Sequence, residues 1–370
     1  MDFFCFMLYN ESMKKGLIIL IGNFLIFILT GCSLTPAVST PNGQQQYAFS
    51  KSVWITKDGG KTWTNSNKAV NKPTVADINP LSLVFDPKDG NVVYTGLRAG
   101  GIIKTANGGE SWESLSFKTD KIYGLALDPN DSKIIYASTV VGDRGKIFKN
   151  FDSGTGGNWN EIYTAATNGP LVVYLTIDKK NANTIYIATS DNQVAKSADG
   201  GVSWKNIFQS KSPVIKISLD AKNSKLIYLL TKSGEIFSSF NNGESFDGLS
   251  AKINKTGFAA AGFSVMETDP SNANWIYLAG KPGIIRSKDA GQNWEKVVTL
   301  NNPQNSPIGA LAINPVNSKE IIYGASQAAY KSIDDGKTWT TSQFDSAKAI
   351  SILKYNPTNP DIIYAGFVGE

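Results

Sequence analysis

The side chains that could carry out chemistry are few in this chain of 370 residues. Histidine is absent, which excludes a Ser-His-Asp triad, a histidine metal site and imidazole acid–base catalysis. Cysteine occurs only at Cys5 and Cys32, so neither a disulfide framework nor a cysteine zinc site can form in the body of the chain. We therefore expect no metal ion and no cofactor.

Carboxylates remain as acid–base groups. A glycosidase pair would need two of them about 5–9 Å apart. Asp120, Asp143 and Asp191 are the plausible donors, and nothing in the sequence brings two of them together. The formal charge of +5 comes mostly from lysine. A mild lysine excess over this length is typical of a soluble surface, so we do not expect nucleic-acid binding.

The N-terminus has the pattern of an export signal. Met13-Lys14-Lys15 is followed by an apolar run over residues 16–29 and then by Leu29-Thr30-Gly31-Cys32. This is a basic region, a short apolar region and small residues before a cleavage point. The run is shorter than the roughly 20 residues that a membrane-spanning helix needs. Leu-Thr-Gly-Cys resembles the lipobox of bacterial lipoproteins, and that resemblance implies cleavage before Cys32 and a lipid on Cys32.

We accordingly divide the chain into three parts. Residues 1–31 are a signal peptide, with Met13 as the better start, and residues 32–47 are a lipidated cysteine with a flexible tether rich in Ser, Thr, Pro and Gln. Residues 48–370 are the folded domain. An uncleaved N-terminal anchor is the alternative. Both interpretations place the domain outside the cytoplasm, on the outer face of the bacterial plasma membrane or at the outer membrane.

Two motifs alternate through the folded domain. The first is an octapeptide such as Thr-Lys-Asp-Gly-Gly-Lys-Thr-Trp at residues 56–63, and its final aromatic residues fall at 63, 112, 159, 204, 246, 294 and 339. The second is an apolar stretch, an Asp/Asn-Pro type of turn and a segment such as Ile-Ile-Tyr. Its tyrosines fall at 94, 136, 186, 228, 277, 323 and 364. Repeats of this length indicate a periodic architecture.

Each period of about 45 residues holds four segments of strand length, which is the size of a β-propeller blade. The sequence therefore predicts an all-β fold, a single seven-bladed propeller of four-stranded blades. The N-terminal end supplies only the third and fourth strands of a blade, from 52–56 and from Trp63. The C-terminal end supplies the first and second, from 350–355 and 362–366. We expect one blade to be shared between the two ends, because closure removes exposed sheet edges.

The octapeptide resembles the Asp-box, or bacterial neuraminidase repeat. The resemblance implies structural turns at the blade periphery, between the third and fourth strands, and neither catalysis nor calcium binding. The residues at the Asp position are Asp58, Asn107, Asp152, Asp199, Asn241, Asp289 and Asp334. The copies around Asp152 and Asn241 are degenerate, the first through extra residues after Gly154 and the second through a final Phe246.

Residues 48–370 resemble the photosystem II stability/assembly factor family, and next to it the xyloglucanase-type propellers. The first resemblance implies a non-enzymatic exported lipoprotein that assists another protein. The second implies a glycan-active hydrolase or carbohydrate-binding propeller, but the second propeller of those enzymes is absent from this chain. The arginine-rich patch associated with assembly factors is missing too. Sialidases share the Asp-box, yet Arg98, Arg144 and Arg286 are the only arginines. We expect Arg98 and Arg144 in loops between second and third strands and Arg286 after a third strand, which does not favour an arginine triad.

Propellers usually bind at the face that carries the loops between second and third strands and between blades. We therefore expect a ring of cations there to bind an acidic or polar segment of a protein partner. The site residues predicted in these loops are Arg98, Arg144, Lys232, Lys281, Asp120 and Lys121. We expect a monomer, attached to a membrane through the lipid on Cys32.

Overall fold

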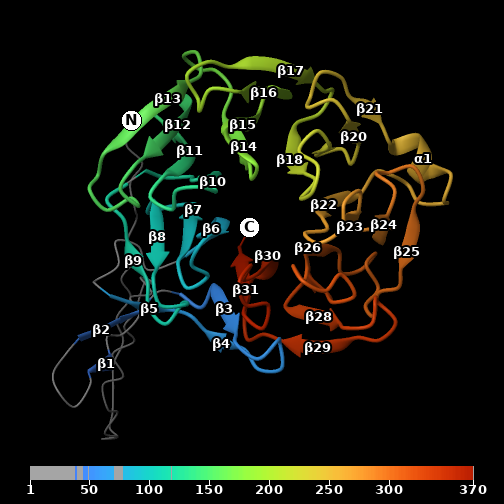
Figure 1. The fold of residues 1–370 in the computed structure, drawn as a ribbon. Helices are drawn as coiled ribbons and strands as arrows, with labels where there is room; N and C mark the ends of the chain where they lie inside the picture. Colours follow the sequence, from blue (N-terminus) through green and yellow to red (C-terminus); the bar gives the residue numbers. More distant parts are fainter. Residues whose placement is uncertain (1–37, 40–44, 49, 71–77, 118, 370) are drawn as a thin grey trace, which may run out of the picture. The chain divides into compact units, whose positions relative to one another are not determined.

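The computed structural model describes residues 38–39, 45–48, 50–70, 78–117 and 119–369. They include seven four-stranded antiparallel sheets that form the blades of a ring (Figure 1). The predicted all-β propeller of seven blades is thereby confirmed. The predicted signal peptide and Cys32 lie outside the described residues.

Six blades are built in chain order from the axis outward, and the seventh combines strands from both ends of the domain. We name the strands of each blade A to D from the axis outward (Figure 1). The A strands are β6 (Pro80–Phe85), β10 (Gly124–Leu127), β14 (Val172–Asp178), β18 (Val214–Leu219), β22 (Phe263–Thr268), β26 (Ile308–Ile313) and β30 (Ala349–Tyr355). The B strands are β7 (Val93–Leu97), β11 (Ile135–Val141), β15 (Asn181–Thr189), β19 (Ile227–Thr231), β23 (Ile276–Gly280), β27 (Ile321–Ala325) and β31 (Ile363–Val368).

The outer half of each blade is a second hairpin. The C strands are β8 (Ile102–Thr105), β12 (Arg144–Asn150), β16 (Gln193–Ser197), β20 (Ile236–Ser239), β24 (Gly283–Ser287), β28 (Ala328–Ser332) and β3 (Val53–Thr56). The D strands are β9 (Glu113–Ser114), β13 (Trp159–Thr164), β17 (Lys205–Gln209), β21 (Asp247–Gly248), β25 (Glu295–Val297), β29 (Thr340–Gln343) and β4 (Thr64–Asn65). Since neighbouring strands are antiparallel, the A–B and C–D connections share one face, the turn face. The B–C and D–A connections share the other, the loop face.

The two ends of the domain close the ring. The last blade has the order β30-β31-β3-β4, with Val53 opposite Gly366 and Thr56 opposite Ile363. The Phe367 N–H also donates to the Ser52 carbonyl oxygen at 2.9 Å. This is the predicted blade shared between N- and C-terminal strands, and it completes the ring with a seventh four-stranded sheet.

Four described elements lie outside the blades. β1 (Val38–Ser39) and β2 (Gln45–Ala48) pair with each other, and β2 pairs with β5 (Lys68–Ala69). The five-residue helix α1 (Ser250–Asn254) lies in the D–A loop after β21. Among the described residues, no helix is long and apolar enough to cross a membrane.

The hydrophobic core lies between neighbouring blades. The B strands β7, β19, β23 and β27 are buried along their whole length, as expected for strands covered on both faces. One cluster combines Val53 and Ile55 of the closing blade with Leu83 and Ile103 of the next. The repeated B-strand tyrosine is fully buried in every blade, at Tyr94, Tyr136, Tyr186, Tyr228, Tyr277, Tyr323 and Tyr364.

Each A–B turn is fixed by a buried Asp or Asn. Asp86, 5% exposed, accepts the N–H of Lys88 at 2.8 Å and the hydroxyl of Ser132 in the following blade at 2.6 Å. Ser224 and Asp178 form the corresponding contact between two other blades. These turns therefore join blades as well as strands, and they hold the A strands in place around the axis.

Candidate functional site

The octapeptide turns are closed polar networks at the ends of the C strands. In one of them, the Ser197 hydroxyl donates to Asp199 Oδ1 at 2.7 Å and accepts the Gly201 N–H at 2.8 Å. Asp199 in turn accepts the N–H and the hydroxyl of Ser203, at 2.9 and 2.5 Å. Gly201 has a φ of 99°, and a Cβ there would lie 2.6 Å from Ile162 Cδ1. Both constraints explain the invariant glycine at this place in the repeat.

The same contacts recur around Asp58, Asp289 and Asp334. Hydrogen bonds from the Thr338 side chain and backbone lower the pKa of Asp334 to about 2. Those from Thr62 and Ser203 hold the pKa values of Asp58 and Asp199 well below their usual range. These carboxylates are ionised and saturated by their own turns, so they are poor acids, bases or ligands.

Two turns use Asn in place of Asp. Asn107 Oδ1 accepts the Ser111 N–H at 3.0 Å, and its Nδ2 donates to the Ser111 hydroxyl at 2.9 Å. Asn241 and Ser245 repeat this pattern. Asp152 differs, because Asn150 accepts the backbone N–H groups of its turn and the buried Oδ1 of Asp152 has no hydrogen-bond partner. Among the described residues, no group of three or more acidic or cysteine side chains is placed to hold a metal ion.

The predicted partner-binding residues all lie on the loop face. Arg98 follows β7 in a B–C loop, and Asp120 and Lys121 lie in the neighbouring D–A loop. The structure brings these three together: the Gly100 N–H donates to Asp120 Oδ1 at 3.2 Å, and the Lys121 N–H donates to the Arg98 carbonyl oxygen at 2.9 Å. All three side chains are exposed.

Lys232 and Lys281 lie in the B–C loops of two other blades, whereas Arg144, predicted in such a loop, is the first residue of β12. The Arg144 guanidinium lies 3.9 Å from the Asp143 carboxylate and donates to the Thr167 hydroxyl. Lys281 lines a pocket of about 380 Å³ together with Phe258, Pro282 and Gln304. Within the described residues, no hydrogen bond or ion pair joins these cations to one another or to Arg98. They share a face as predicted, but they form no single cluster.

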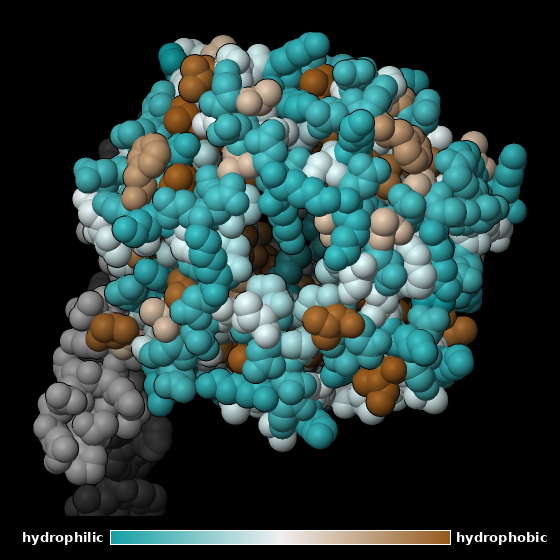
Figure 2. Space-filling model, in the orientation of Figure 1, coloured by the Kyte–Doolittle hydropathy of each residue, from teal (hydrophilic) through white to brown (hydrophobic). Residues whose placement is uncertain are grey.

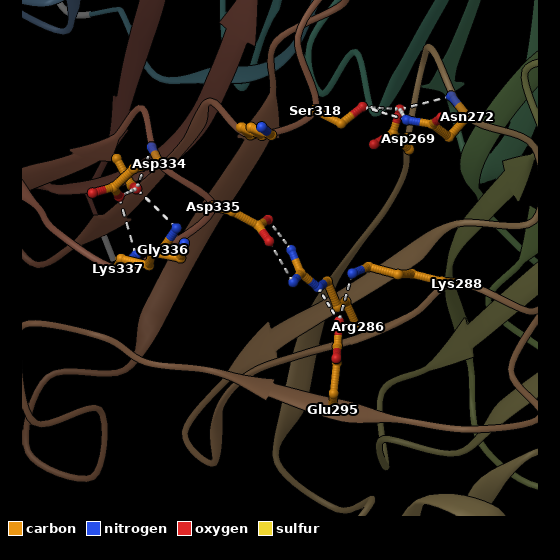
Figure 3. A network of polar contacts seen from close by, with 12 residues as sticks. Asp269, Asn272, Arg286, Lys288, Glu295, Ser318, Asp334, Asp335, Gly336 and Lys337 are labelled. Carbon is orange, nitrogen blue, oxygen red and sulfur yellow. Dashed lines mark hydrogen bonds and ion pairs between the residues drawn. The ribbon is translucent and has the colours of Figure 1, made fainter.

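Arg286 belongs to the opposite side of the molecule. The sequence interpretation placed it after a C strand, whereas it lies within β24. Its guanidinium binds both carboxylate oxygens of Asp335 in the next blade's octapeptide turn and also Glu295 at 2.6 Å, which Lys288 contacts as well (Figure 3). Arg286, only 6% exposed, therefore links two blades and does not converge with Arg98 and Arg144.

A charged cluster lies inside the ring, and the sequence analysis missed it. Lys216 of β18 and Lys354 of β30 both donate to Oε1 of Glu267 of β22, at 2.9 and 3.2 Å. The Lys216 ammonium also faces the Tyr174 ring, 5.7 Å from its centroid. These residues line a central cavity of about 810 Å³ to which all seven A strands contribute. Figure 2 looks into this hollow, whose rim is mainly hydrophilic.

The ionisation of the cluster follows from its geometry. Burial alone would raise the pKa of Glu267, but the charges of Lys216 and Lys354 outweigh it and lower that pKa to about 2. Burial opposes the charge on Lys216 as well, yet Glu267 raises the pKa of this lysine. For Lys354, the attraction of Glu267 is outweighed by burial and by the repulsion of Lys216 and Lys179, so its pKa is lowered.

A sequence signal for this cluster did exist. Glu267 and Lys354 stand two residues before the Asp or Asn of their A–B turns, and Lys216 stands four residues before its own. Alternate residues of a strand share a face, and the residues three before the turn, such as Met266 and Leu353, are buried in the core. The positions two and four before the turn therefore face the axis, where charged residues interrupt a lining of small and apolar ones.

The ring of blades defines the protein as a seven-bladed β-propeller. No family model matches the chain. A stretch covering 34% of it is 28% identical to the xyloglucanase Xgh74A of Acetivibrio thermocellus, and that match spans 19% of the enzyme.

Solved structures share the fold. The GH74 xyloglucanase of Xanthomonas campestris matches with a TM-score of 0.63 at 15% identity, covering 79% of this chain and 51% of that one. A structure of YCF48 bound to a D1 peptide matches with a TM-score of 0.56 at 13% identity, covering 79% of this chain and 94% of that one. The chain thus spans about half of the xyloglucanase and nearly all of YCF48.

Proposed function

We propose that this protein is a non-enzymatic binding module, resembling an assembly factor, that holds an acidic or polar segment of a partner protein on its loop face. The observation that carries the proposal is the likeness to YCF48 with a bound D1 peptide, a match that spans 94% of that chain. The match therefore covers nearly the whole of the peptide-bound chain. A single propeller of this fold is thus compatible with peptide binding.

The charges on the loop face support this choice of partner. Arg98, Lys232 and Lys281 are exposed and form no ion pair with any residue that the structure describes. Arg144 is only partly neutralised by Asp143. Exposed cations distributed around one face attract an acidic segment and act mainly on its rate of association. The pocket beside Lys281, with Phe258 and Pro282, offers an apolar contact next to one of these charges.

Charge reversal tests the face. We would change Arg98, Arg144, Lys232 and Lys281 to Glu, and in a matched control Lys61, Lys133, Lys319 and Lys337, which are exposed on the turn face. The probes are a fluorescent oligoglutamate peptide and in-cell crosslinking. We expect the loop-face variant alone to lose both signals, and the wild-type signal to weaken as salt rises from about 0.1 M to 1 M. Equal loss in both variants would eliminate the loop face as the site.

We also propose export and attachment through a lipid on Cys32, on the strength of the Leu-Thr-Gly-Cys motif. The variant Cys32→Ala should move the protein from the membrane fraction to a soluble or uncleaved form. Unchanged processing and membrane retention in this variant would show that the lipoprotein interpretation is wrong.

A glycan-active or carbohydrate-binding propeller is the second candidate, favoured by the 28% identity to a xyloglucanase. Against catalysis in the central cavity, Glu267 is the only carboxylate in the described lining, and two lysines hold it ionised. On the loop face, Asp120 accepts the Gly100 N–H of the neighbouring B–C loop, and Asp191 accepts the hydroxyl of Thr189 at the end of β15. Incubation with xyloglucan should release no reducing sugar, and turnover that is lost in Glu267→Gln would replace the first proposal.

A further inference from the structure

The central cluster leaves hydrogen-bonding capacity unused inside the channel. Both lysines donate to the same oxygen, Oε1 of Glu267, although each ammonium has three donors. The Lys354 side chain is 38% exposed and that of Lys216 is 20% exposed. Free N–H donors therefore face the cavity, where a ligand can reach them.

The charge balance of the cavity is positive. Its lining holds the cations of Lys179, Lys216 and Lys354 against the single carboxylate of Glu267, so three positive charges face one negative charge. Lys179 lies directly after β14, at the end of the channel formed by the A–B turns. Confined charges of one sign raise the local concentration of the opposite ion, and partial burial makes the repulsion between Lys216 and Lys354 costly.

The rest of the wall combines aliphatic side chains with hydroxyl groups such as those of Ser82, Thr176 and Ser351. The lining includes Val84 of β6, Ala126 of β10 and Ala310 of β26, and also Ile352, two residues before Lys354 on β30. These side chains are small or aliphatic. A volume of about 810 Å³ falls in the range of small-molecule sites, which are mainly apolar with a few polar groups that fix orientation. The cavity thus suits a ligand with an anionic end and an apolar body.

We propose that the central channel binds a small organic carboxylate, which enters past Lys179 and is held by Lys354 and Lys216 with its apolar part against β6 and β10. The bound carboxylate becomes the second acceptor for donors that Glu267 leaves free. Lys354 then gains a counter-charge that the unliganded cluster supplies only in part. The site lies on the axis, apart from the loop-face cations. Carboxylate binding in the channel can therefore be tested independently of partner binding on the loop face.

The test uses 4-bromobenzoate as the probe and its neutral amide, 4-bromobenzamide, as the control ligand. Binding to the propeller domain of the mature chain is measured by calorimetry. We expect the carboxylate to bind and the amide to bind at least about 10-fold more weakly, because a hydrogen bond to a charged group is lost. Anomalous scattering from bromine in a crystal should place the ligand beside β18 and β30.

Three variants sharpen the test. Lys354→Met should weaken carboxylate binding about 10-fold or more while Glu267 keeps its contact with Lys216. Lys179→Met, an exposed position that leaves the cluster intact, should weaken it less. Glu267→Gln should strengthen it, because the competing carboxylate is gone. The matched control Lys61→Met, an exposed lysine in a peripheral octapeptide turn, should leave it unchanged.

Equal affinity for the amide would overturn the proposal, and so would unchanged binding in Lys354→Met or bromine located outside the channel. If Glu267→Gln does not fold, weakened binding in Lys354→Met beside unchanged binding in Lys61→Met still decides the question. Loss of partner capture in the loop-face variant with intact carboxylate binding would separate the two sites.

Discussion

The C–D turns and the central channel both hold ionised carboxylates, but different partners stabilise them. At the turns, Asp199 is held by residues at most four positions away in the sequence. In the channel, Glu267 is held by Lys216, 51 positions away, and by Lys354, 87 positions away. The first arrangement is local and repeated, whereas the second exists in one place and requires the closed ring.

This contrast distinguishes residues that stabilise the fold from residues that could form a binding site. A network that recurs in blade after blade serves what the blades have in common, which is the C–D hairpin and its packing on the neighbouring blade. The charged cluster in the channel occurs only once among the described residues, so it is not required for the structure that the blades have in common. We therefore regard departures from the repeat as better indicators of a site than the repeat itself.

Removal of residues 350–370 should have the largest effect. It deletes β31 and nearly all of β30, and with them the pairing of β31 to β3. It also removes Lys354 from Glu267, while the local turn networks of the other blades stay complete. We expect an aggregated or unfolded product because sheet edges and apolar faces are exposed. A soluble truncation with one cooperative melting transition would show that the turns, and not closure, hold the ring.

Much of the fold could be predicted because the signals are local. Turn residues, strand lengths and the buried Tyr of each B strand recur with a fixed order, so blade number and the shared blade follow from the sequence. The channel cluster could not be predicted in the same way. That Glu267 faces the axis follows from its distance to Asp269, but its contact with Lys354 depends on ring diameter and side-chain reach. The pocket at Lys281 likewise depends on the conformation of the long loop after β21.

Acidification should weaken both kinds of site. The pKa values of Asp334 and Glu267 are lowered to about 2, below the roughly 3.9 and 4.3 of the unfolded chain. A lowered pKa in the folded state gives stability that is complete above the unfolded value and is lost as pH falls through the folded one. The melting temperature should therefore fall between about pH 4 and pH 2. A melting temperature that stays constant over this range would contradict the assigned ionisation.

Loss of Arg286 should be the next largest effect. Arg286→Met leaves Asp335 and Glu295 close together without their shared cation. We expect a loss of about 2 kcal/mol in the free energy of unfolding, because a nearly buried guanidinium makes these contacts. Glu267→Gln should cost less, since the lysines of the channel remain accessible to water. Urea unfolding of the two variants compares them, and a larger cost for Glu267→Gln would reverse the assignment of structural and functional clusters.

The smallest effect, and the most specific, concerns a single turn. Asp199→Ala removes the acceptor of the Ser203 N–H and hydroxyl and should lower the melting temperature measurably at pH 7. Asp199→Asn should stay near wild type, because Asn107 and Asn241 already close equivalent turns with Oδ1 accepting the N–H and Nδ2 donating to the serine hydroxyl.

The two variants should also respond differently to acid. An amide cannot be protonated in this range, so the deficit of Asp199→Asn, if one is measured at pH 7, should shrink as pH falls below about 4, because the unfolded wild-type chain then binds a proton that its folded turn does not. Carboxylate binding in the channel should be the same in both folded variants and in the wild type, since the turn lies at the periphery of its blade and contributes nothing to the cavity lining. If Asp199→Asn melts as low as Asp199→Ala, the charge of Asp199 stabilises the turn, and its hydrogen-bond geometry alone is insufficient. If either variant loses carboxylate binding in the channel while its melting stays cooperative, the turn at the periphery and the channel are coupled. The repeated turn networks and the channel cluster would then not act independently.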